Sequence, residues 1–187
     1  MPRPSPAEWL SAHAAHHDVV QWATAYADDW QRLWNECPRG DWLLGLAARL
    51  EVERPLLVLA AAAAARTALE ALPEGEARPK GALEVAEAWA RGGASLDQCR
   101  EQALALERYS PADPAVAAAA AACLSALCAV EDADSAAGAA ANAAQAALFG
   151  AGDCALLPLL SYAQRQTAER VREHLPFELV AARLDSA

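Results

Sequence analysis

Apolar residues recur every three or four positions along most of this chain, which is the spacing of one face of an α-helix. A clear example follows Asp18, where Val19, Trp22, Tyr26, Trp30 and others keep this spacing. Runs in which apolar and polar residues alternate strictly, as in a half-buried β-strand, do not stand out. We therefore expect an all-α protein.

Capping residues and prolines mark where the predicted helices begin. Their start signals predict about nine helices, which open near Ser5, Asp18, Asp41, Pro55, Arg78, Ser95, Asp113, Asp134 and Asp153, with Pro176 opening a further short one. The second helix is expected to run unbroken to about Cys37, and the helix from Pro55 to extend through Leu69. Capping boxes of the form Ser-x-x-Glu/Gln support the starts at Ser5 and Ser95.

The expected organisation is one helical domain over residues 1–187 with three parts. These are tryptophan-rich helices at 5–50, alanine-rich hairpins at 54–148 and C-terminal helices at 153–185. The hairpins have a period of roughly 40 residues, a length seen in helical repeats, so a compact bundle and a short irregular solenoid both stay open. Alanine side chains favour close approach of helix axes in either arrangement.

Large apolar side chains are concentrated at the N-terminal end, where five of the six tryptophans lie within the first 42 residues. We expect them to form the core that alanine cannot supply, because alanine buries little surface. The alternative is an aromatic binding surface, since tryptophan is enriched at interface hot spots.

The chain is acidic, with a formal net charge of −10. That charge argues against nucleic-acid binding and against docking on an anionic membrane, and it suits a basic protein partner. No stretch is long and apolar enough to span a membrane, and no secretory signal is visible, so a cytoplasmic location is expected. The candidate partner-binding residues are acids near helix ends and turns, namely Glu101, Glu107, Glu131, Asp132 and Asp134.

Residue patterns for catalysis or metal binding are weak. His13, His16 and His17 cluster, but no carboxylate pattern completes a metal site. The five cysteines contain no Cys-x-x-Cys pair, and no nucleophile has a recognisable base, so we expect neither a cofactor nor a metal. Glu84 and Glu87 are either a paired-carboxylate acid/base site or, as we favour, a buried salt-bridge network with Arg66, Arg78 or Arg91.

The segment from Arg78 to Gly92 predicts a short helix with Pro79 in its first turn and a glycine stop. Leu83, Ala86 and Ala90 form its apolar stripe, and we expect Trp89 to be a buried anchor. This segment belongs to a set of four stretches, which are Cys37-Pro-Arg-Gly-Asp-Trp-Leu-Leu-Gly-Leu46, Ala65-Arg-Thr-Ala-Leu69, Pro73-Glu-Gly-Glu-Ala-Arg-Pro79 and Ala82-Leu-Glu-Val-Ala-Glu-Ala-Trp-Ala-Arg-Gly92.

Together these stretches resemble the helical immunity-protein family of bacterial polymorphic toxin systems, over roughly residues 37–148. Leu83 replaces the family's isoleucine, and Gly81 departs from its usual longer side chain. The residues on the motif-bearing stretches that we single out are Asp41, Trp42, Arg66, Arg78, Pro79, Glu84, Glu87 and Trp89. The resemblance implies a protein that neutralises a toxin by binding it, and it brings no catalytic residues.

Three hypotheses of function follow. The first is a non-enzymatic protein that binds and neutralises a cognate toxin of basic charge. The second is a helical adaptor or scaffold for an unrelated protein. The third is an enzyme with a site around Glu84, Glu87 and Asp41.

Overall fold

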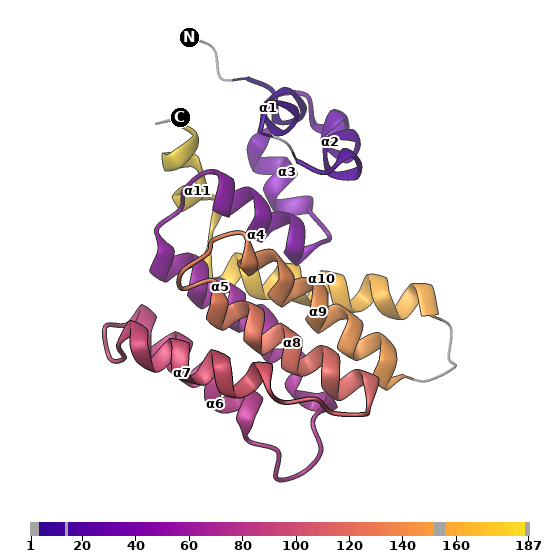
Figure 1. Ribbon diagram of the computed structural model, residues 1–187. Coiled ribbons are helices and arrows are strands. Elements are labelled where there is room, and N and C mark those ends of the chain that lie inside the picture. The colour runs from indigo at the N-terminus through magenta and orange to yellow at the C-terminus, as the bar shows by residue number, and fades with distance from the viewer. Residues whose placement is uncertain (1–3, 14, 152–155, 186–187) are drawn as a thin grey trace.

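The computed structural model describes residues 4–13, 15–151 and 156–185, and every regular element within them is helical. The all-α prediction is confirmed, and the expected number of about nine helices is close to the eleven α-helices found in the described residues. In Figure 1 the first half of the chain forms α1 (Pro6–Ala12), α2 (His17–Ala23), α3 (Trp30–Glu36), α4 (Gly40–Arg49), α5 (Arg54–Arg66) and α6 (Arg78–Ala90). The second half forms α7 (Leu96–Glu107), α8 (Pro114–Cys128), α9 (Ser135–Gly150), α10 (Leu156–His174) and α11 (Phe177–Leu184). Two short 3-10 helices are η1 (Thr24–Tyr26) and η2 (Leu69–Ala71).

The long helix predicted after Asp18 is wrong, because the chain breaks it into α2, η1 and α3. His16, and not Asp18, is the N-cap of α2, since its side chain accepts a hydrogen bond from the backbone N–H of Asp18. Ala27 then adopts a left-handed backbone with φ of 47°, which no α-helix can contain. Asp29 caps the new helix by accepting a hydrogen bond from the backbone N–H of Arg32 at 2.8 Å.

Other helix ends also differ from the sequence predictions. Arg39 is the N-cap of α4, and Asp41 lies within its first turn instead of capping it. The helix from Pro55 ends at Arg66, and Leu69 belongs to the separate turn η2. The predicted capping boxes at Ser5 and Ser95 are confirmed. The predicted cap at Asp153 lies outside the described residues.

Tryptophans fill the core at the N-terminal end, as the sequence predicts. Trp9, Trp30 and Trp34 are at most 6 % exposed, and the rings of Trp9 and Trp30 meet edge to face at 5.9 Å. The indole N–H of Trp34 donates to the backbone oxygen of Leu175 at 3.1 Å, which ties α3 to the end of α10. Trp22 and Trp42 are half-buried and pack on this core.

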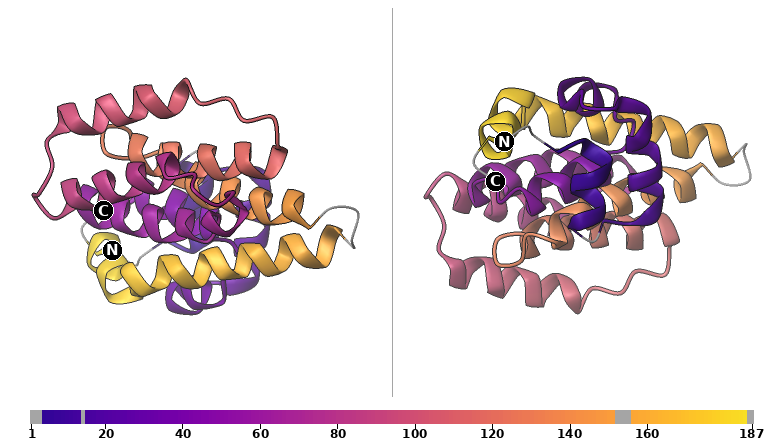
Figure 2. Two further views of the ribbon diagram at one scale, coloured as in Figure 1. Left: turned by 90° about the horizontal axis from the view of Figure 1, so that it is seen from below. Right: turned by 90° about the horizontal axis from the view of Figure 1, so that it is seen from above.

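Alanine-lined helices form the centre of the bundle. Helix α5 packs against α4, α6, α8, α9 and α10, and α10 also packs against α4 and α9 (Figure 2). The alanines of α5 at positions 60–62, 64 and 65 are fully buried. Small side chains let these helices approach closely, so contacts between segments far apart in sequence hold the helical bundle together.

Helix α6 confirms the predicted segment in outline but not the burial of its tryptophan. Pro79 lies in the first turn, and Leu83 and Ala86 are buried against α5 and α8. Trp89 is half-buried against the core instead of fully buried. Within the described residues, none of the helices is sufficiently long and apolar to cross a membrane.

Because Trp89 is only half-buried, its removal should reduce stability less than the removal of a buried tryptophan. We expect Trp89→Ala to lower the free energy of unfolding by about 2 kcal/mol, less than the 3–5 kcal/mol typical of a fully buried tryptophan. Trp89→Phe, which keeps most of the apolar surface, should lose less than half as much. Urea denaturation of the three proteins checks this, and equal midpoints would show that Trp89 contributes nothing to stability.

Candidate partner-binding surface

Helix α7 lies along the outer edge of the bundle in both views of Figure 2. It packs mainly against α6 and α8, and only Cys99 and Leu106 of its twelve residues are buried. Leu104, on the outward side of the helix, is 52 % exposed. An exposed leucine alone is ordinary, so what matters is the surface beside it.

A groove of about 310 Å³ runs between α7 and the C-terminal end of α8. Its apolar wall is made of Cys99, Ala103, Leu104, Leu127, Cys128 and Val130. Its charged lining residues are Arg100, Glu107 and Glu131. We call this feature the α7–α8 groove.

The structure places the five acids predicted to bind a partner on or near this groove, and all five are exposed. Glu107 and Glu131 line it. Glu101 lies one helical turn from Leu104, while Asp132 and Asp134 belong to the turn between α8 and α9. Residues 97–134 contain seven carboxylates and two guanidiniums. Asp113 caps the start of α8, and the other charged residues lie on α7 or just after α7 or α8, namely Asp97, Glu101, Glu107, Glu131, Asp132 and Asp134 against Arg100 and Arg108.

These acids are not equivalent. Glu131 pairs with Arg100 at 2.6 Å, and the hydrogen bonds from that guanidinium lower the pKa of Glu131. Asp134 is the N-cap residue of α9, as predicted, but its side chain makes no capping bond; Asp132 instead accepts hydrogen bonds from the backbone N–H of Asp134 and from the Ser135 hydroxyl. Glu101 and Glu107 are therefore the acids best suited to testing electrostatics without disturbing a cap or an ion pair.

Two thiols line the groove, and neither is suited to nucleophilic chemistry. Burial raises the pKa of Cys99 and that of Cys128, and nearby carboxylates add to the effect in both cases. Because the thiolate is the reactive form, both groups remain neutral thiols near pH 7. Cys99 and Cys128 are therefore poor nucleophiles near neutral pH.

The motif residues on α6 form ion pairs. Glu87 accepts a hydrogen bond from Arg66 at 2.6 Å and lies 3.5 Å from Arg91, which confirms the predicted network for this residue. Glu84, in contrast, is exposed and pairs with Lys80 at 3.8 Å, so its predicted burial is wrong. The two side chains differ because residues three apart point in directions about 60° apart around the helix axis. Only Glu87 points toward α5, where it meets Arg66.

Arg78 pairs not with these glutamates but with Glu76, just before α6. Its guanidinium also lies 3.8 Å from the ring centre of Tyr109, which follows α7. This contact joins the start of α6 to the end of α7, so the Arg78-Pro79 motif has a structural role here.

Acid should weaken the fold through these pairs. Hydrogen bonds from Arg78 lower the pKa of Glu76 to about 2. Burial acts to raise the pKa of Glu87, but the bonds and charges of Arg66 and Arg91 outweigh it and the pKa is lowered. The unfolded chain binds these protons near pH 4.3 and the folded chain only at lower pH, so the free energy of unfolding falls as the pH drops from about 4 toward 2.

Glu76→Gln should flatten that acid slope, and Arg78→Gln should flatten it equally, because each removes the same pair. Chemical denaturation at a series of pH values between about 2 and 5 measures the slope. Identical slopes in the parent and both variants would show that the pair does not titrate with folding.

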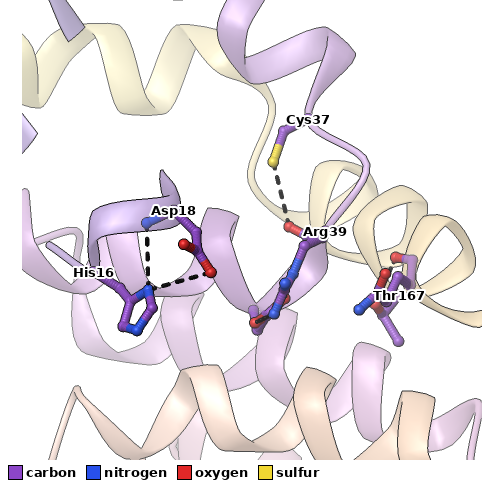
Figure 3. Close-up of polar contacts among 7 residues, drawn as sticks. His16, Asp18, Cys37, Arg39 and Thr167 are labelled. Carbon is purple, nitrogen blue, oxygen red and sulfur yellow. Dashed lines mark hydrogen bonds and ion pairs between the residues drawn. The ribbon is translucent and has the colours of Figure 1, made fainter. Parts of the chain in front are cut away.

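A second cleft, of about 350 Å³, lies between α2 and α4 and holds the motif residues Asp41 and Trp42. Arg39 donates to Asp41 at 3.0 Å, and its guanidinium lies 4.5 Å from the ring centre of Trp42. Figure 3 shows that His16 faces Asp18 across from Arg39. Asp41 and Trp42 are thus both engaged by Arg39, which favours a structural role for them.

Cys37, also in Figure 3, donates to the backbone oxygen of Arg39 at 3.4 Å. Burial raises the pKa of this thiol to about 12, so it is unsuited to act as a nucleophile. Among the clustered histidines, His13 stacks on Trp9, with 3.9 Å between the two ring centres. Within the described ranges, no three histidine, cysteine or acidic side chains form a group that could hold a metal ion.

A third cleft, of about 490 Å³, lies between α5 and α10 and is mostly polar. Arg66, Glu70, Glu169 and Glu173 are among the residues that line it, but Glu84 and Glu87 are not. Asp41 lies in the α2–α4 cleft instead. None of the three clefts therefore brings together the carboxylates of the enzyme hypothesis.

Comparison of this chain with models of protein families, with curated proteins and with solved structures finds no match. The resemblance to the immunity-protein family thus rests on the residues of the four motif stretches alone.

Proposed function

We propose that this chain is a non-enzymatic protein that binds and neutralises a basic bacterial toxin in the cytoplasm. The observation that carries the proposal is the α7–α8 groove, an open apolar surface with acids at its edge. Apolar surface at the centre and charge at the rim is the usual anatomy of a protein interface. The resemblance to the immunity-protein family over roughly residues 37–148 supports a toxin as the partner.

Charge complementarity suits this role. Many toxins that act on nucleic acids need a basic cleft to hold phosphates, and an acidic inhibitor is drawn to such a cleft by long-range attraction. A net charge of −10 speeds that encounter, while the apolar groove supplies contacts that slow dissociation. No metal, cofactor or catalytic group is needed for inhibition of this kind.

The adaptor or scaffold hypothesis uses the same groove with a partner that is not toxic. The two proposals differ in one property of the partner, which is whether its expression alone arrests growth. The test is to express the partner with and without this chain in a host that contains neither. Arrest that is relieved by the chain supports neutralisation, whereas a harmless partner supports the adaptor.

If charge attraction steers binding, the association rate constant should fall when salt is added or when acids near the groove are reversed in charge. We expect Glu101→Lys with Glu107→Lys to cut the association rate constant for a basic partner roughly tenfold or more at low salt, with little change in melting temperature. The matched control reverses two exposed acids away from the groove, Asp28→Lys with Glu178→Lys, and should reduce the rate much less. Stopped-flow mixing at several salt concentrations measures both, and a rate that does not depend on salt would contradict electrostatic steering.

A further inference from the structure

We propose that the α7–α8 groove receives an amphipathic helix of the partner, with an apolar stripe over Ala103 and Leu104 and with lysine or arginine facing Glu101 and Glu107. This inference rests on the proposed function and deepens it, because it names the element of the partner that binds. It follows from the backbone, shape and charge of the groove.

The backbone of the groove walls favours a helix as the occupant. Both walls are α-helices whose amide groups are already bonded within each helix, and the described residues offer no open sheet edge for an extended peptide to pair with. An extended segment in this apolar groove would leave its own N–H and C=O groups without partners, at a considerable cost. In a helix, the backbone N–H and C=O groups are already hydrogen-bonded to one another, so a helical segment avoids this cost.

The shape of the groove fits the same occupant. The side chains of Cys99, Ala103 and Leu104 line the groove on the α7 side, and Leu127 and Cys128 of α8 form the opposite wall. Two helices side by side form the type of groove into which a third helix packs. The twelve residues of α7 span about 18 Å, so a partner segment of about three turns matches its length.

The charged residues near Leu104 indicate which charge the partner helix should carry beside its apolar stripe. Glu101 and Glu107 stand three residues before and after Leu104, so both neighbour it on the helix surface. Arg100 and Arg108, four residues before and after Leu104, also neighbour it. The guanidinium of Arg100 is engaged by Glu131 at 2.6 Å and by Asp97 at 3.4 Å. Of the described residues beside Leu104 on this helix, Arg108 is then the one remaining cation against the two carboxylates of Glu101 and Glu107. A helix whose apolar stripe covers Leu104 therefore meets carboxylates at its flanks, and basic residues there pair with them.

Cys128 provides a reporter within the groove. It is half-buried, whereas Cys37, Cys99 and Cys123 are buried. Replacing Cys154, which lies outside the described residues, with serine leaves Cys128 as the most accessible of the remaining thiols. At mildly alkaline pH, which raises the thiolate fraction, Cys128 reacts with a maleimide, and an occupant of the groove should slow that reaction.

The probe is a synthetic 14-residue peptide with leucines at helical spacing and lysines on both flanks. One matched peptide carries glutamate in place of each lysine, and another has the lysine peptide's composition with its leucines scattered around the helix. Titration calorimetry with the full chain measures affinity, and mass spectrometry measures the labelling rate of Cys128. We expect the lysine peptide alone to bind well and to slow labelling severalfold.

Variants of the chain locate the binding. Leu104→Glu should weaken the lysine peptide at least tenfold, and Glu101→Gln with Glu107→Gln severalfold at low salt. Asp28→Asn with Glu178→Gln, an equal change in net charge elsewhere, should alter the affinity less than twofold. Unchanged melting temperatures are expected for all three, because each changed side chain is exposed. Equal binding of the three peptides, or an affinity that Leu104→Glu leaves unchanged, would overturn the proposal.

Different outcomes would contradict the helix in the groove and the neutralisation of a toxin. If the peptide binds in the groove but the captured partner is harmless, the groove is assigned correctly and neutralisation is wrong. If a toxin is neutralised equally well by the parent and by Leu104→Glu, neutralisation stands and the helix in the groove is wrong.

Discussion

Gly40→Ala should lower the free energy of unfolding by about 3 kcal/mol. Gly40 opens α4 where it crosses α10, and a Cβ atom there would lie 2.7 Å from the hydroxyl oxygen of Thr167 and 2.8 Å from its backbone carbonyl carbon. The side chain can turn away, but the backbone of α10 can move only by separating the two helices. The effect is steric, because Gly40 does not have a left-handed backbone.

Gly81→Ala is the matched control for this substitution. Gly81 lies inside α6, and a Cβ atom there would meet nothing within 4 Å. Alanine favours helix over glycine, so we expect a gain of about 0.5–1 kcal/mol. Thr167→Ala should only partly rescue Gly40→Ala, since the contact with the backbone carbon remains. Equal denaturation midpoints for the Gly40 and Gly81 variants would show that α4 and α10 are not in close contact at this point.

Trp34→Ala should cost about 4 kcal/mol or more, because the side chain is 1 % exposed and fills the junction of α3 with α10. The change removes a large apolar volume and also leaves the buried backbone oxygen of Leu175 without its indole donor. Thermal and urea unfolding of the variant measure the loss.

Trp34→Phe separates the two contributions. Phenylalanine keeps most of the apolar contact but cannot donate to Leu175, so a loss of about 1–3 kcal/mol is expected for the hydrogen bond and the smaller ring. If the alanine and phenylalanine variants lost the same amount, the hydrogen bond and not the packed volume would dominate. If neither lost stability, α3 would not be anchored at Leu175.

Local sequence signals place the starts of most helices well, although the caps predicted at Asp18 and Asp41 differ by two residues from the N-caps found. The capping boxes at Ser5 and Ser95 and the prolines at 55, 79 and 114 all open helices. The break at Ala27 was missed because apolar periodicity continues across it, and alanine gives no sign of a left-handed backbone.

The candidate surface could be predicted only in part. Acids at helix ends are visible in the sequence, and the five selected ones are exposed. Leu104 was missed because it falls beside the stripe of Cys99, Ala103 and Leu106, and an apolar residue off the stripe does not by itself indicate a surface. The groove depends on how far α8 lies from α7, which is a tertiary property that periodicity does not encode.

The charged motif residues show a related limit. Sequence spacing suggested one network for Glu84 and Glu87, but the orientation of α6 turns Glu87 toward Arg66 and leaves Glu84 with Lys80. Helix spacing determines which residues share a face, while the neighbours of that face come from the packing of α5 and α6.

Site-specific photo-cross-linking in the native cell can show whether a toxin binds at the α7–α8 groove. A photoreactive amino acid replaces Leu104 in the groove or, as a control, the exposed Tyr162 on α10. We expect a cross-link from position 104, and not from 162, to a basic protein that arrests growth when expressed alone and is neutralised by this chain. An adduct formed only from position 162, or a toxin neutralised without any contact at position 104, would contradict this expectation.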